Sequence, residues 1–112
     1  MEQKQVLILA EYSEAIKKEL SGRFSARCNL AFAEDETDLE AAISRAEFII
    51  GEPRRSLLVK AKALSVLQLT WAGVDQYAGM SNFPEGVTLC NVSGAFGTVI
   101  SEYVLGSIVA FY

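Results

Sequence analysis

The feature that most constrains this chain is the alternation of short apolar runs with helix-like or turn-rich stretches. The first run, Val6–Ala10, is apolar at every position, which is typical of a strand covered on both faces. Further runs lie at 27–33, 48–50, 66–70 and 87–92, and the first of these alternates in part, as an edge strand does. Alternation of strands with helices predicts a parallel sheet with right-handed crossovers.

Helical periodicity fills the first three gaps between these runs. Thr37 and Glu40 have the spacing of a capping box, and Ser56 is a candidate N-cap for the next helix. The gap from 71 to 86 is rich in turn residues and has room for only a short helix. The expected inward faces are Ile16, Leu20 and Phe24; then Leu39, Ala42, Ile43 and Ala46; then Leu57, Ala61 and Leu64.

We therefore expect an α/β fold of the flavodoxin-like kind, a five-stranded parallel sheet in the order 2-1-3-4-5 with helices on both faces. The length of 112 residues suits a single domain, residues 1–112.

The last segment, Val99–Tyr112, predicts a helix that begins near Thr98 and is apolar on nearly every side. Such a helix must be buried on more than one side, and a sheet of this size covers only one. We expect a partner to cover the rest, so the chain is predicted to form a homo-oligomer, most simply a homodimer, through Val99–Tyr112. No C-cap signal follows Tyr112, which indicates a fragment of a longer protein.

Composition argues against several classes of function. The basic residues are scattered along a chain of net charge −4, whereas nucleic-acid binding needs a clustered basic face. Histidine, the commonest general base and metal ligand, does not occur. We expect neither a metal site nor catalytic residues. The N-terminus has no signal peptide, and Glu102 and Ser107 interrupt the last apolar stretch, so a cytoplasmic protein without a membrane span is expected.

Candidate ligand-binding residues follow the last two strands, and ligands bind open α/β sheets at the carboxyl ends of strands. Trp71–Asp75 is either a tight turn or a loop that presents amides to an anion, with Gly73 permitting close approach. Ser93–Thr98 is either a helix N-cap or an anion site. Taken alone, each loop favours the purely structural interpretation. The pair Arg54-Arg55 at the same edge is either solvated or able to hold a carboxylate.

Two phosphate-binding alternatives share this fold. A dinucleotide-binding turn needs G-x-G-x-x-G after the first strand, but Glu11–Glu14 contains no glycine and two carboxylates that oppose phosphate. A phosphoacceptor receiver domain fits Glu11 and Thr70, yet Glu52 stands where its aspartate is needed and no lysine ends the fifth strand. A receiver-like or protein-interaction module stays the alternative.

Three segments, Leu67–Asp75, Gly86–Gly97 and Ile100–Gly106, resemble the N-terminal domain of the D-isomer-specific 2-hydroxyacid dehydrogenases. The first half of the chain matches that family only in its pattern of elements. The resemblance implies the substrate-binding domain of an NAD- or NADP-dependent oxidoreductase. In that family a Rossmann domain follows the last helix seen here, and we expect this chain to be truncated before it.

The resemblance also implies roles for individual residues. The amides of Ala72, Gly73 and Val74 would hold the carboxylate of a 2-hydroxy or 2-oxo acid, and Thr98, at a helix start, would lie near the nicotinamide of the cofactor. The other residues implied at the substrate are Glu52, Pro53, Arg54 and Trp71. The family's catalytic Arg, Glu and His and its Gly-rich cofactor loop lie downstream, so this chain alone is expected to be inactive.

Overall fold

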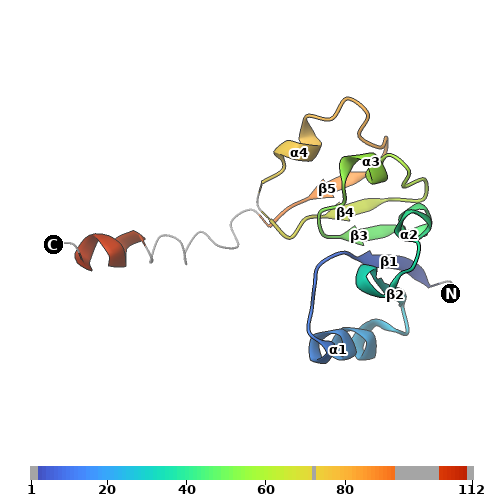
Figure 1. Ribbon diagram of the computed structural model, residues 1–112, viewed down its shortest axis with the longest axis horizontal. Helices are drawn as coiled ribbons and strands as arrows, with labels where there is room; N and C mark the ends of the chain where they lie inside the picture. The colour runs from blue at the N-terminus through green and yellow to red at the C-terminus, as the bar shows by residue number, and fades with distance from the viewer. Residues whose placement is uncertain (1–2, 72, 93–103, 111–112) are drawn as a thin grey trace.

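The computed structural model describes residues 3–71, 73–92 and 104–110, and Figure 1 shows its central sheet, with the helix of residues 104–110 standing apart from it. All strands are parallel, in the order β2-β1-β3-β4-β5. The fold class and the strand order predicted from the sequence are confirmed. The strands are β1 (Lys4–Ile8), β2 (Cys28–Phe32), β3 (Phe48–Ile50), β4 (Val66–Gln68) and β5 (Thr88–Cys90).

The helical elements divide between the two faces of the sheet. They are α1 (Glu14–Phe24), the short 3-10 helix η1 (Ala33–Asp35), α2 (Leu39–Arg45), α3 (Arg55–Leu58) and α4 (Asp75–Ala78). Since successive side chains of a strand point to opposite faces, Leu7 packs with α2, α3 and α4, whereas Val6 and Ile8 pack on the side of Leu20 in α1. The larger core therefore lies on the side of α2, α3 and α4.

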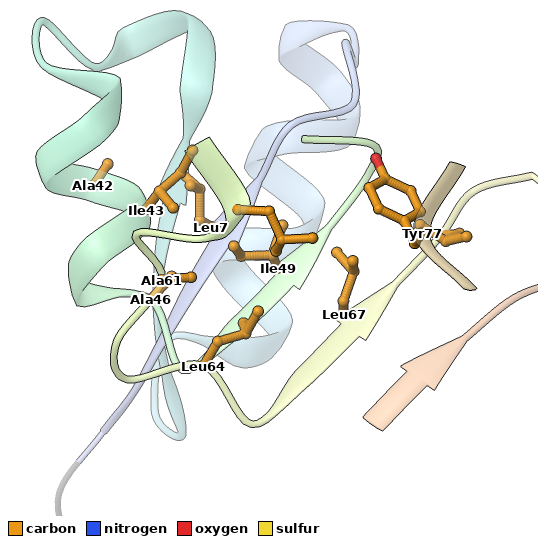
Figure 2. Packing of buried hydrophobic residues seen from close by; sticks show 11 residues of the cluster. Leu7, Ala42, Ile43, Ala46, Ile49, Ala61, Leu64, Leu67 and Tyr77 are labelled. Atoms are coloured by element: carbon orange, nitrogen blue, oxygen red, sulfur yellow. The ribbon is translucent and has the colours of Figure 1, made fainter. Parts of the chain in front are cut away.

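This larger core is built from the middle of the sheet outward (Figure 2). Ile49 of β3 and Leu67 of β4 are both 0% exposed, and Ile43 of α2 and Leu58 of α3 cover them. Tyr77 of α4 closes the core at its far end and is 1% exposed. Of the inward positions predicted for α2, Ala42, Ile43 and Ala46 are buried, and Leu39 is half-buried against the same core.

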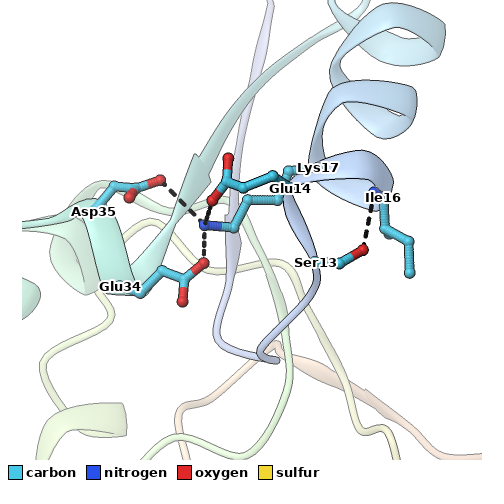
Figure 3. A network of polar contacts seen from close by, with 6 residues as sticks. All are labelled: Ser13, Glu14, Ile16, Lys17, Glu34 and Asp35. Carbon is cyan, nitrogen blue, oxygen red and sulfur yellow. Dashed lines mark hydrogen bonds and ion pairs between the residues drawn. The ribbon is translucent and has the colours of Figure 1, made fainter.

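The apolar face predicted for α1 is wrong at two positions. Ile16 and Phe24 are 44% and 45% exposed, whereas Lys17 is buried at 6%. Figure 3 shows the reason: the Lys17 ammonium lies among the carboxylates of Glu14, Glu34 and Asp35. It also lies 5.2 Å from the centre of the Phe32 ring. A paired lysine with its stem on apolar surface can be buried, so charge rather than apolar spacing decides which side of α1 faces inward.

Several predicted boundaries also need correction. Asp38, not Thr37, caps α2 by accepting a hydrogen bond from the Ala41 amide at 3.1 Å. Ser56 does not begin α3, which starts one residue earlier without a side-chain cap and ends at Leu58. The Ala61 amide then bonds to the Leu58 carbonyl at 3.0 Å, so the chain turns towards β4 early. β4 and β5 are shorter than their apolar runs.

Residues 104–110 are helical, in agreement with the predicted last helix, whose expected start at Thr98 lies outside the described residues. Its apolar side chains are exposed: Val104 by 50%, Leu105 by 63%, Ile108 by 52% and Val109 by 66%. Among the described residues, no helix combines the length and apolarity needed to cross a membrane.

Candidate carboxylate-binding site

The loops that follow β3, β4 and β5 meet at one edge of the sheet. Backbone pairing continues past the strand ends, because the Gly51 amide bonds to the Gln68 carbonyl at 2.9 Å and the Leu69 amide to Cys90 at 2.8 Å. The Val92 amide also donates to the Trp71 carbonyl at 3.3 Å. The chain after β5 therefore runs beside the start of the Trp71–Asp75 loop as far as Val92, and Ser93–Thr98 lies outside the described residues.

A carboxylate from the first of these loops anchors the second. Glu52, two residues after β3, accepts hydrogen bonds from the Thr70 amide at 3.3 and 3.4 Å to its two oxygens. The Thr70 hydroxyl donates to the same carboxylate, at 3.0 Å to Oε2 and also to Oε1. Both residues are half-buried. A charged acceptor strengthens such bonds, so Thr70 is firmly held.

A second anchor lies at the far end of the same loop. The Tyr77 hydroxyl donates to the Pro53 carbonyl at 2.7 Å, and both residues are buried. Burial raises the pKa of Tyr77, and the Glu52 carboxylate acts in the same direction. The hydroxyl therefore keeps its proton and remains a donor at neutral pH. Residues 52 and 53 thus hold the chain at residue 70 and again at residue 77.

Between these anchors the described residues of the loop are exposed or half-buried. Trp71 is 65% exposed, Gly73 is exposed and Val74 is half-buried. Arg54 and Arg55 are exposed at the neighbouring loop. The structure therefore brings Glu52, Pro53 and Arg54 to the same edge as Trp71, Gly73 and Val74. Ala72 and Thr98 lie outside the described residues.

The two glycines at this edge of the sheet differ in whether the fold requires glycine at their positions. Gly51 has φ +127°, and a Cβ there would lie 2.7 Å from the Leu9 Cβ, so both conformation and space require glycine. Gly73 has no positive φ, and a Cβ there would meet nothing within 4 Å. The described part of the fold therefore does not require glycine at residue 73.

Comparison with solved structures identifies the relatives of this arrangement. The chain superposes with TM-score 0.80 and 31% identity on the crystal structure of a D-isomer specific 2-hydroxyacid dehydrogenase family protein from Aeromonas salmonicida subsp. salmonicida A449, covering 98% of this chain. This chain belongs to that family. It spans only 36% of the length of that relative, so it corresponds to one part of a family member.

A second solved structure has the same fold as this chain. It is the PH0520 protein from Pyrococcus horikoshii OT3, with TM-score 0.60, 20% identity and coverage of 94% of this chain and 32% of that one. No protein-family model and no curated protein sequence matches the chain.

Two residues that support the loop at this edge of the sheet were not predicted from the sequence as part of the site. Thr70 entered the sequence analysis only as a possible receiver residue, and Tyr77 did not enter it. Their partners are 18 and 24 residues away, and no local pattern marks such pairs. Among the described residues, no cluster of Cys, Asp or Glu could hold a metal ion.

Proposed function

We propose that this chain is the substrate-binding domain of an NAD- or NADP-dependent D-2-hydroxyacid dehydrogenase and binds the carboxylate of a 2-hydroxy or 2-oxo acid. The observation that carries the proposal is the exposed loop between Trp71 and Val74, anchored at both ends at the carboxyl edge of the sheet. The backbone amides of a loop held at both ends are suited to binding an anion.

Each implied residue has a role in this proposal. The amides of Ala72, Gly73 and Val74 donate to the substrate carboxylate, and the indole of Trp71 covers the substrate from solvent. The exposed guanidinium of Arg54 adds positive charge beside the anion. Glu52 and Pro53 flank the site through the two anchors.

In the complete enzyme, the bound acid would exchange a hydride with the nicotinamide and a proton with a catalytic acid or base. The residues that do this in the family are not in this chain, so its part of the reaction is to bind and orient the acid. Thr98 is proposed to lie near the nicotinamide. The isolated chain is proposed to be inactive.

A titration of the 15N-labelled chain with pyruvate, a small 2-oxo acid, tests the binding. We expect saturable shifts of the Gly73 and Val74 amide signals and weaker shifts with acetate, which lacks the oxo group. In Gly73→Ala the new methyl group would stand in the ligand space, so we expect affinity to fall about tenfold while the free energy of unfolding changes by less than about 0.5 kcal/mol.

Gly22→Ala is the matched control, because its Cβ would also meet nothing within 4 Å and it lies on α1. Pyruvate binding that leaves Gly73 and Val74 unmoved would refute the proposed site. A beryllofluoride and magnesium titration checks the receiver-like alternative, which is disfavoured because Glu52 is engaged by Thr70.

We also propose that the isolated chain self-associates through Val99–Tyr112. The support is the exposure of four apolar side chains on the helical segment 104–110, which together form a patch typical of interfaces. Sedimentation velocity over a wide concentration range should show a dimer. Leu105→Asp should shift it to the monomer, whereas Ile16→Asp, at an exposed apolar position on α1, should not. A wild-type monomer at every concentration would contradict this proposal.

A further inference from the structure

We infer that Glu52 is a positioning residue: its carboxylate holds Thr70, and through it the carboxylate-binding amides, without touching the substrate. This rests on the proposed function, because it assigns how the binding loop obtains its geometry. It also changes the role of Glu52 from a substrate contact to a support.

The contacts and the charge of Glu52 suit a support for the loop rather than a contact to an acidic ligand. Both carboxylate oxygens accept from Thr70, one from its amide at 3.3 Å and the other at 3.4 Å, and each also receives the hydroxyl. A carboxylate has only acceptor sites at neutral pH, and so does the carboxylate of the proposed substrate. Direct contact between the two would be repulsive.

Thr70 is placed to transmit this support. It is the residue directly before Trp71, so the direction of its peptide sets where the following amides begin. Pro53, the neighbour of Glu52, accepts from Tyr77 at the other end of the loop at 2.7 Å. Two consecutive residues after β3 therefore fix both ends of a loop whose middle is exposed.

The two possible roles of Glu52 predict opposite changes in ligand affinity for the same substitution. If Glu52 touched the bound acid, Glu52→Gln would remove a like charge and tighten binding. If Glu52 positions the loop, Glu52→Gln replaces one acceptor oxygen by a donor NH2 group that faces the Thr70 amide, so the loop loosens and binding weakens.

The first measurement needs no ligand. Amide hydrogen exchange of Thr70 in the free chain should be roughly tenfold faster in Glu52→Gln than in the wild type. Glu47→Gln is the matched control: Glu47 precedes β3 at the opposite edge and its carboxylate likewise accepts a backbone amide, that of Gln5 at 2.8 Å. That control should leave exchange at Thr70 unchanged.

The second measurement is the pyruvate affinity of the same variants. We expect a loss of about tenfold in Glu52→Gln and in Thr70→Val, affinity near wild type in Thr70→Ser, which keeps the hydroxyl, and no change in Glu47→Gln. The double variant Glu52→Gln/Thr70→Val should bind no more weakly than either single variant, because both remove the same interaction.

The outcomes separate this inference from the proposed function. Tighter binding in Glu52→Gln, or Thr70 exchange equal to that of Glu47→Gln, would overturn the positioning role. Failure of the wild type to bind pyruvate would refute the proposed function, and the exchange measurement would then still decide whether Glu52 holds the loop.

Discussion

Gly51→Ala is expected to lower the free energy of unfolding by about 2–5 kcal/mol, because it combines a strained backbone with a steric overlap. Gly51 has φ +127°, and the added Cβ would lie 2.7 Å from the Leu9 Cβ and 3.3 Å from the Ala10 amide nitrogen. Leu9 belongs to the neighbouring chain segment after β1, so relief would require the two segments to separate. Urea unfolding followed by circular dichroism measures the effect.

Gly86→Ala separates the two causes. Gly86 has φ +79°, but a Cβ there would meet nothing within 4 Å, so only the backbone cost remains, about 1 kcal/mol. Equal losses in the two variants would show that the overlap with Leu9 has no energetic weight and would contradict the expected order.

Ile49→Ala is expected to cost about 2–5 kcal/mol, from lost apolar burial and from the cavity that remains. Ile49 is 0% exposed in β3 and packs between Leu7 and Leu67 on the adjacent strands. Ile16→Ala makes the same change at a position that is 44% exposed on α1, where less than about 0.5 kcal/mol is expected. Comparable losses of unfolding free energy in the two variants would contradict the prediction that burial of Ile49 in the core makes its truncation costly.

The sequence predicted the sheet well because a parallel sheet covered on both faces needs continuous apolar runs. The five strands were read from such runs, and their order from the flavodoxin-like fold that the alternation favours. Helix α2 followed from the spacing of Leu39, Ala42, Ile43 and Ala46. The exact ends of the strands could not be predicted from the sequence. Hydrophobicity continues past Gln68 to Leu69, although the regular strand does not.

Helix α1 shows where apolar spacing fails. Ile16 and Phe24 have the correct spacing for an inward face, yet Lys17 takes that place, because Glu34 and Asp35 come from a separate element to pair with it. A period of hydrophobicity contains no information about ion pairs that form between distant segments.

The sequence predicted which loops lie at the carboxyl ends of the strands, but not the hydrogen bonds that hold the Trp71–Asp75 loop. The rule that ligands bind at the carboxyl ends of parallel strands led to Trp71–Asp75 and to the pair Arg54-Arg55, whereas Glu52 came from the family resemblance. The hydrogen bonds from Thr70 to Glu52 and from Tyr77 to Pro53 join residues far apart in the chain and depend on side-chain orientation. Only three-dimensional structure reveals which acidic residue supports the loop.

Two hydrogen-bonded contacts, from Thr70 to Glu52 and from Tyr77 to Pro53, tie the loop between residues 70 and 77 to the chain that leaves the central strand β3. Glu52 and Pro53 follow β3 after Gly51, and Ile49 of β3 lies in the middle of the core. The position of the loop therefore depends on a strand other than the one that precedes it. A substitution that lets β3 slide by a fraction of an ångström would move both anchors together. Affinity for the proposed ligand should therefore respond to substitutions in the interior as well as at the surface.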